Sequence, residues 1–170
     1  MHIARLQFAD APQYRALMLE AYALAPDAFT SSAEDRALEP ESFWVKRLSD
    51  PAGLSLAFGA FDDQGLVGTV ALKFSDKPKT RHKDSVIGMY VGPGARGKGI
   101  GSALLGAAIQ EAQSRADVLV LTLTVTEGNT SATNLYRAAG FEVFGIQPMA
   151  IRTPGGFLSK VHMWRRVSHA

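Results

Sequence analysis

A glycine-rich segment between an apolar run and an amphipathic run restricts the fold more than any other feature of the sequence. Half of the residues from Gly92 to Gly101 are glycine, and Arg96 and Lys98 stand between them. Residues 86–91 predict a strand, and apolar residues at helical spacing over 100–112 predict a helix. Glycines let several backbone N–H groups converge, and a helix N-terminus adds positive potential. The segment therefore predicts a strand, a loop and a helix that together bind a phosphate group.

Several phosphate-binding patterns fit parts of this segment. Residues 92–97 fit a dinucleotide fingerprint, but the acidic residue expected about 20 residues further on is misplaced, because Asp117 precedes the next strand instead of ending it. Residues 92–98 fit most of a P-loop, yet Gly99 stands where Ser or Thr must hold Mg²⁺. A steric turn that binds nothing would need fewer glycines. An NTPase is disfavoured, and an NAD(P)-binding oxidoreductase stays as an alternative.

The composition is that of one soluble domain. The chain has 170 residues, a net charge of +2 and no cysteine, which excludes disulfides, cysteine-ligated metals and a thiol nucleophile. No run approaches the roughly 18–20 apolar residues that span a bilayer, and the N-terminus does not resemble a signal peptide. The basic stretch 77–83 has no interleaved aromatics and predicts a solvated loop. We expect a cytoplasmic protein with no metal and neither nucleic acid nor membrane as a partner.

Hydropathy along the rest of the chain predicts an α+β fold. Alternating or apolar runs predict strands, three- and four-residue spacing predicts helices, and their order predicts a mixed, mostly antiparallel sheet of six or seven strands flanked by about four helices. The expected strands are 2–8, 54–60, 70–74, 86–91, 119–125, 141–151 and 157–166, and the expected helices are 10–25, 40–48, 100–112 and 130–139.

Two segments resemble the GNAT superfamily of acyl-CoA N-acyltransferases. Met89–Leu105 contains the Arg-x-x-Gly-x-Gly pattern of its pyrophosphate loop, and Asn129–Phe141 is similar to its Asn, Ala, Leu-Tyr, Gly-Phe pattern. The resemblance implies a single acetyltransferase domain over 1–170 whose sheet splays between the fourth and fifth strands. Residues 1–83 would shape the acceptor site, 84–145 would bind acetyl-CoA, and 146–170 would form closing strands.

The resemblance also implies roles for individual residues. Backbone amides from Arg96 through Ser102 would hold the pyrophosphate, the strand ending at Val91 would pair with the pantetheine arm, and an amide near Met89 or Tyr90 would polarise the thioester carbonyl. Asn129 would hydrogen-bond the pantetheine or the backbone around it, and Tyr136 would give a proton to the departing thiolate. The acetyl-CoA site so predicted comprises Met89, Tyr90, Val91, Arg96, Gly97, Lys98, Gly99, Ile100, Gly101, Ser102, Asn129 and Tyr136.

The implied reaction is direct attack on acetyl-CoA by the primary amine of a small molecule or peptide in a ternary complex. Family members that acetylate protein N-termini often carry Glu where this chain has Thr124, so Glu127 is the candidate base. Phe29 and Glu34 are candidates for binding the acceptor. A catalytically silent acyl-CoA-binding module of the same fold is the alternative from another class. The C-terminal strands could support a homodimer; the acceptor and the use of longer acyl-CoAs stay open.

Overall fold

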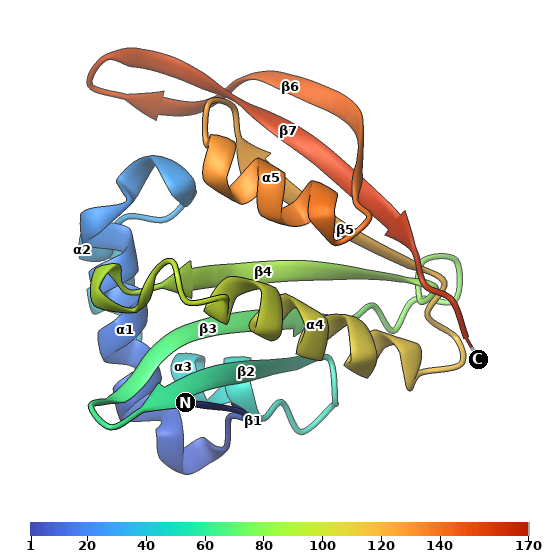
Figure 1. The fold of residues 1–170 in the computed structure, drawn as a ribbon, viewed down its shortest axis with the longest axis horizontal. Coiled ribbons are helices and arrows are strands. Elements are labelled where there is room, and N and C mark those ends of the chain that lie inside the picture. Colours follow the sequence, from blue (N-terminus) through green and yellow to red (C-terminus); the bar gives the residue numbers. More distant parts are fainter. Residues whose placement is uncertain (170) are drawn as a thin grey trace.

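Seven strands form one mixed sheet in the computed structural model, which describes residues 1–169 (Figure 1). The strand order is β1-β2-β3-β4-β5-β7-β6, and only β4 and β5 pair in parallel. This is the mixed, mostly antiparallel α+β architecture that the sequence predicts. The strands are β1 (His2–Arg5), β2 (Ser55–Asp62), β3 (Gly65–Lys73), β4 (Lys83–Val91), β5 (Val120–Thr126), β6 (Glu142–Thr153) and β7 (Gly156–Arg166).

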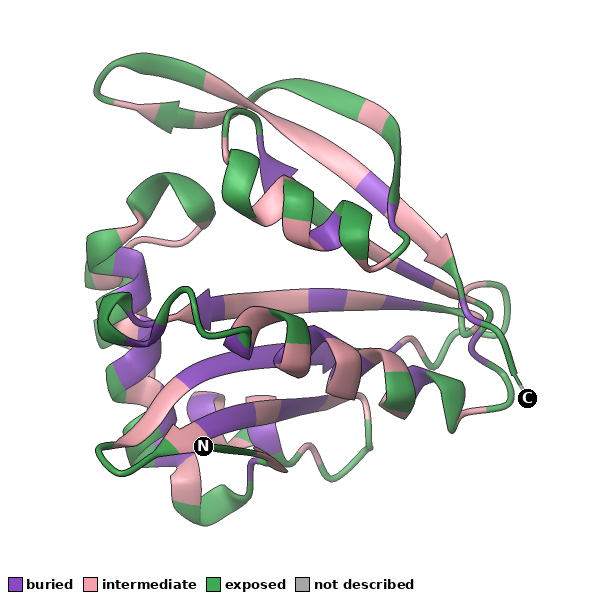
Figure 2. Cartoon of the chain, viewed as in Figure 1, coloured by how far each residue is buried: buried purple, intermediate pink, exposed green. Residues whose placement is uncertain are grey.

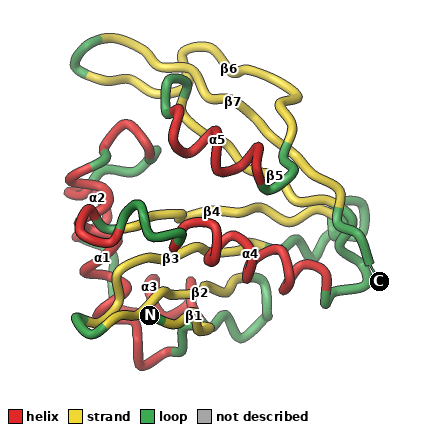
Figure 3. The backbone as a smooth tube through the Cα atoms, in the orientation of Figure 1, coloured by secondary structure: helices red, strands yellow, loops and turns green. Residues whose placement is uncertain are grey.

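Helices cover both faces of the sheet (Figure 3). On one face, helix α1 (Ala11–Leu24) and helix α3 (Glu41–Leu48) pack on β2 and β3, with the short helix α2 (Ala33–Ala37) beside α1. On the other face lie α4 (Ile100–Gln113) and α5 (Thr130–Ala138). One face therefore carries the N-terminal helices, and the other carries the two helices of the predicted binding core.

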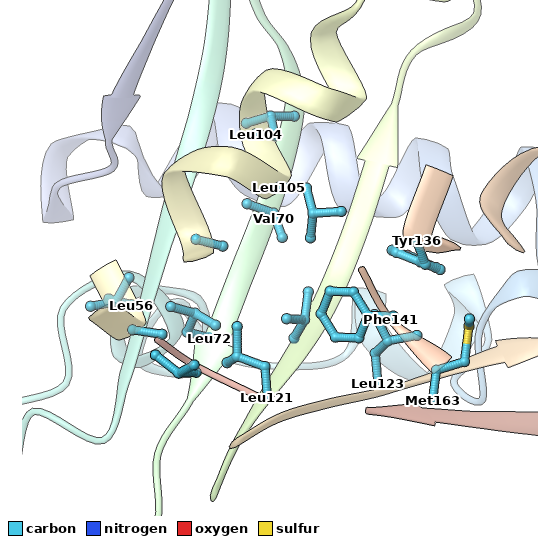
Figure 4. Packing of buried hydrophobic residues seen from close by; sticks show 14 of the residues in the cluster. Leu56, Val70, Leu72, Leu104, Leu105, Leu121, Leu123, Tyr136, Phe141 and Met163 are labelled. Carbon is cyan, nitrogen blue, oxygen red and sulfur yellow. The ribbon is translucent and has the colours of Figure 1, made fainter. Parts of the chain in front are cut away.

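The core follows the strand alternation. Leu56 and Val70 pack under α4, whereas their chain neighbours Ala57 and Ala71 face α1 and α3. Figure 4 shows Leu104, Val70 and their neighbours in the first of these layers. Burying each large aliphatic side chain stabilises the fold by about 1.5–3 kcal/mol. Buried residues follow the central strands, while β6 and the tip of the β6–β7 hairpin are largely exposed (Figure 2).

The sheet splits between β4 and β5, as predicted. The two strands pair only over three residues each, Lys83–Ser85 with Val120–Thr122, and then diverge towards their C-terminal ends (Figure 1). Just past the paired residues, β4 has a bulge: the register between β3 and β4 shifts, and β4 has one residue more than the segment of β3 that faces it. Gly88 lies in this bulge with φ +59°, a left-handed backbone that glycine adopts without strain.

Several element boundaries differ from the predicted ones. The first strand ends at Arg5 instead of residue 8, because the chain turns into a 3₁₀ segment that leaves Phe8 66% exposed. The third and fourth strands begin earlier than predicted, at Gly65 and Lys83. Among the described residues, one short helix adds to the about four that were predicted: Ser32 accepts the Asp35 N–H and caps α2, in a segment for which no helix was predicted. The fifth strand starts one residue late, and Leu119 is half exposed.

Within residues 1–169, no group of three or more His, Asp or Glu side chains gathers closely enough to hold a metal ion. In the same range, no helix has the length and apolar character needed to cross a membrane. The division of the chain into 1–83, 84–145 and 146–170 remains a prediction.

Candidate active site

A cavity of about 490 Å³ occupies the region where β4 and β5 diverge. Its walls come from β4, the loop and first turn of α4, β5, α5 and the segment after α1. Most of the predicted site residues line it: Phe29, Met89, Tyr90, Val91, Arg96, Gly97, Gly99, Ile100, Gly101, Ser102, Asn129 and Tyr136. The fold thus brings together two sequence motifs that lie some 30 residues apart.

The N-terminus of α4 presents free amides to this cavity. Gly99 precedes the helix with φ +75°, and no side chain caps it. The first amide in the helix with a backbone partner is that of Ala103, which donates to the Gly99 carbonyl at 3.1 Å. Within the described residues, no acceptor meets the amides of 97–102. Unpaired amides at the positive end of a helix dipole form an anion site.

Among the described residues, the edge of β4 that faces the cavity has no strand partner beyond Ser85. Gly92 donates its N–H to Val67 on β3 at 2.9 Å, and the Val91 carbonyl points the other way, accepting from Arg96 Nε at 2.9 Å. Because N–H and C=O groups of successive residues alternate between the two edges of a strand, the Tyr90 amide faces β3 and the Val91 amide faces the cavity, whose wall Met89 also lines. Of the two predicted carbonyl-polarising amides, this alternation favours Met89 over Tyr90.

Tyr136 lies at the inner wall of the cavity, on α5. Its side chain is only 7% exposed and packs edge-on against Phe141, with ring centroids 6.1 Å apart. Burial raises the pKa of the Tyr136 hydroxyl to about 12, so it stays protonated at neutral pH. Asn129 positions the helix, because its Oδ1 accepts the Ala132 N–H at 3.2 Å and so caps α5. Asn129 also lines the cavity, and its Nδ2 group is a donor that the cap does not use.

Three predicted residues lie outside the cavity lining. Lys98 donates to the Gly94 carbonyl at 3.1 Å and so braces the loop from outside. Glu34 is exposed on α2. Glu127 is exposed and lines a second cavity of about 390 Å³, whose walls are α5 and the β6–β7 strands. The structure therefore separates the predicted base Glu127 from Tyr136, and no carboxylate or imidazole is among the described residues that line the first cavity.

Two side-chain pairs beside the cavity were not predicted from the sequence: Tyr90 with Glu20, and His162 with Gln147. The Tyr90 hydroxyl donates to Glu20 Oε1 at 3.0 Å, and burial and this carboxylate raise the Tyr90 pKa. His162 on β7 lies directly opposite Thr124, which lines the cavity. Its Nε2 lies 3.3 Å from Gln147 Oε1. No linear motif marks either pair, because each joins strands and helices that are far apart in the chain.

The sequence matches the family model described as "Acetyltransferase (GNAT) family" over residues 18–141. It is 33% identical over 138 residues to a mycothiol acetyltransferase of Rhodococcus jostii, covering 79% of this chain and 43% of that protein. It is 30% identical over 119 residues to an L-methionine sulfoximine/L-methionine sulfone acetyltransferase of Pseudomonas paraeruginosa, covering 68% and 60%. The chain thus spans less than two thirds of the length of both relatives.

The fold is also that of a solved acetyltransferase. A phosphinothricin acetyltransferase of Sinorhizobium meliloti, solved in complex with acetyl-CoA, superimposes with a TM-score of 0.84. The alignment covers 98% of this chain and 88% of that one at 23% identity. At this identity the likeness concerns the fold alone.

Proposed function

The chain belongs to the acetyltransferase (GNAT) family, and on that premise we propose that it transfers an acetyl group from acetyl-CoA to the primary amine of a small molecule or peptide. The observation that carries the proposal is the row of unpaired amides over 97–102 at one end of a cavity whose other end holds the buried Tyr136 hydroxyl. The alternatives, a silent acyl-CoA-binding module and an NAD(P)-binding oxidoreductase, predict different chemistry at that cavity.

The residues present suit acetyl-CoA. The free amides of 97–102 bind the pyrophosphate, and the free edge of β4, through Met89 and Val91, hydrogen-bonds the pantetheine arm as an added strand would. The Val91 carbonyl already accepts from Arg96 Nε and has a second lone pair that can accept from a ligand. When bound, acetyl-CoA supplies the acetyl group as a thioester. No metal is part of the proposal.

Tyr136 holds the proton that the reaction needs on the thiol side. Overall, an amine C–N bond replaces the thioester C–S bond, and one proton passes from the amine to the thiol. A phenol with a pKa of about 12 keeps its proton at neutral pH, so it can donate a hydrogen bond to the thiolate as it forms and stabilise the negative charge on the sulfur. Met89 contributes its N–H as a donor to the carbonyl oxygen, where negative charge develops.

His162 is the group we propose to take the proton from the amine, in place of Glu127. Directly opposed residues on antiparallel strands have Cβ atoms about 4.5–5.5 Å apart, so the imidazole lies next to Thr124 at the cavity wall. A hydrogen on Nε2, donated to the Gln147 amide oxygen, leaves the lone pair of Nδ1 free to accept a proton. The Phe144 ring, 5.8 Å away, supports the imidazole edge-on.

The experiment that tests the function measures thiol release from acetyl-CoA with a panel of amines. We expect release that depends on both the protein and one class of amine, and an N-acetylated product by mass spectrometry. Tight CoA binding with no release for any amine would favour the silent module. Preference for NAD(P)H over CoA in a direct binding comparison would favour the oxidoreductase.

The partner and location predictions stay with the proposal. One relative is named for mycothiol and another for methionine sulfoximine or sulfone, which supports a small-molecule acceptor. A homodimer is supported by exposed apolar side chains on the β6–β7 strands, and sedimentation of the purified chain tests it. The exposed apolar side chains are Val143, Phe144, Ile146, Met149 and Phe157.

The cytoplasmic location is tested by fractionation of the source cells.

A further inference from the structure

A cluster of hydrogen-bond donors without acceptors lies under helices α1, α2 and α3. The Tyr14 hydroxyl, the Trp44 indole nitrogen and the Arg36 Nε are all buried, and none has a hydrogen-bond partner among the described residues. Tyr14 and Trp44 pack edge-on with ring centroids 6.0 Å apart, and Phe43 packs edge-on against Trp44. Buried polar groups are nearly always paired, because an unpaired donor loses its hydration without compensation. Three orphaned donors in one cluster indicate that an acceptor belongs there.

Arg47 adds a cation to the same cluster. Its guanidinium and that of Arg36 share one aromatic ring, lying 5.8 Å and 4.6 Å from the Phe43 centroid. Arg36 has Glu39 at 3.3 Å as an ion-pair partner, whereas no carboxylate among the described residues lies within 4 Å of Arg47. Two neighbouring guanidinium groups with one carboxylate leave a positive charge that an anion would neutralise.

Two side chains of this cluster, Tyr14 and Arg47, reach the bulge in β4. A β-carbon built on Gly88 would lie 3.6 Å from Arg47 Nη1 and 3.7 Å from the Tyr14 hydroxyl, with nothing closer. Because glycine has no such atom, a space the size of one oxygen lies between Gly88 and two donors. Burial raises the Tyr14 pKa to about 12 although Arg47 pulls it down, so the hydroxyl remains a donor at neutral pH.

The position of this space relates it to the reaction. Gly88 is partly exposed, and it directly precedes Met89, which lines the cavity. An anion held between Arg47 and Tyr14 would therefore lie one residue along the strand from the proposed carbonyl-binding amide. It would also lie on the α1 face of the sheet, opposite the face that carries α4 and α5.

We infer that Arg47 and Tyr14, with Arg36 behind them, bind the carboxylate of the acceptor, and that the acceptor is an α-amino acid or a close analogue. A carboxylate offers only acceptors, and it suits the N–H groups of Arg47 and the Tyr14 hydroxyl, which can donate. In an α-amino acid, the amine and the carboxylate share one carbon, so anchoring the carboxylate beside Gly88 brings the amine next to Met89. This inference rests on the proposed function and names its acceptor class.

The first test varies the acceptor and leaves the protein unchanged. Each of a set of α-amino acids is compared with its primary amide and its decarboxylated amine in the thiol-release assay. We expect kcat/KM to fall by about 100-fold when the carboxylate is removed, in line with the loss of a buried charged hydrogen-bonded pair. Equal use of the amides or amines overturns the carboxylate site but keeps the acetyltransferase. Release with no amine of any kind overturns the proposed function itself.

The second test changes the site and includes a readout other than turnover. Arg47→Gln and Tyr14→Phe should each raise KM for the amino acid at least tenfold, while KM for acetyl-CoA and kcat stay within about twofold. A saturating amino acid should raise the melting temperature of the wild type but not of Arg47→Gln, whereas CoA should raise both. Arg152→Gln is the matched control, because Arg152 also stacks on an aromatic ring, that of Phe157 at 5.2 Å, but on the exposed hairpin.

The outcomes separate the alternatives. If Arg47→Gln raises KM for an amide as much as for the amino acid, the residue supports the fold and the inference is wrong. If Arg47→Gln does not fold, Arg47→Lys keeps the charge but loses the paired N–H geometry. That variant should then show an intermediate KM for the amino acid and an unchanged KM for acetyl-CoA; an unchanged KM for both would contradict the inference.

Discussion

Two regions meet at the bulge in β4, and they are built from different parts of the backbone and side chains. On the α4 side, the groups proposed to bind acetyl-CoA are backbone amides of one short loop and one strand edge. On the α1 side, the groups proposed to bind the acceptor are side chains, Tyr14, Arg36 and Arg47, carried by three separate helices. A third region, the paired start of β4, binds nothing and holds the two halves of the sheet together.

The difference shows what each kind of site requires. A site made of amides needs a particular backbone path, and that path requires glycines at fixed spacing within about ten residues. A site made of side chains needs only that the helices pack in one arrangement, so its residues follow no spacing along the chain. The following predictions test whether the three regions are as separate as the structure indicates.

Removing the Tyr136 hydroxyl should give the largest effect. Tyr136→Phe keeps the ring that packs on Phe141 and deletes only the proton donor. A positioned general acid typically contributes 10²–10⁴-fold, so we expect kcat to fall by about 10³-fold with the Kd for CoA nearly unchanged. Stopped assays of thiol release and calorimetric titration with CoA measure the two quantities. Wild-type turnover in this variant would remove Tyr136 from the mechanism.

Asp84, in the paired region of β4, should make the free energy of unfolding depend on pH. Its side chain is buried, and neither carboxylate oxygen has a hydrogen-bond partner among the described residues. Burial raises the Asp84 pKa from 3.8 to about 7, although Arg115 nearby lowers it. The folded protein therefore binds a proton that the unfolded chain has already lost, and stability falls as the pH rises from about 4 to about 7.

Asp84→Asn should remove this pH dependence. Relative to the wild type, the free energy of unfolding of the variant should improve by up to about 4 kcal/mol between pH 4 and pH 7, since one pKa unit is about 1.4 kcal/mol. Urea denaturation across that range measures the difference. A difference that does not vary with pH would show that Asp84 titrates normally. Turnover at a fixed pH should stay within about twofold, because the paired region does not line the cavity.

His162 and Glu127 form a matched pair for the proton acceptor. His162→Gln should lower kcat/KM by about 100-fold. Glu127→Gln should change kcat/KM by less than about twofold, because Glu127 lines the other cavity. The reverse pattern would return the role to Glu127 and would mean that the two cavities are connected during turnover.

A single methyl group in the amide-rich loop should give the smallest effect. Gly99→Ala places a β-carbon on a residue with φ +75°, where a left-handed backbone costs about 1–2 kcal/mol. We expect the Kd for CoA to rise about fivefold to tenfold and kcat to stay near the wild-type value. Gly94→Ala is the control, because a β-carbon there meets no atom within 4 Å and the residue does not have a positive φ. Equal effects of both changes would contradict a site made of oriented amides.

Much of the fold could be predicted from local patterns. The apolar spacing of 100–112 reappears as the buried stripe of α4, with Leu104 and Ala108 fully buried, because a helix must bury the face that its spacing creates. The expected splay between the fourth and fifth strands is confirmed by their three-residue pairing. The short α2 and the end of β1 were missed, since both depend on single capping and turning residues that compete with weak local preferences.

The sequence by itself determined the side of the protein that is proposed to bind acetyl-CoA. The residues there act through their backbone, and the glycines that permit that backbone, such as Gly99, must stand at fixed positions in one segment. Only the tertiary structure decided the other side. In the folded chain, Glu127 lines a separate cavity and His162 lies opposite Thr124, while Tyr14 and Arg47 lie beside Gly88. Side chains brought together by packing have no fixed distance along the chain, so their joint chemistry becomes visible only once the helices and strands are in place.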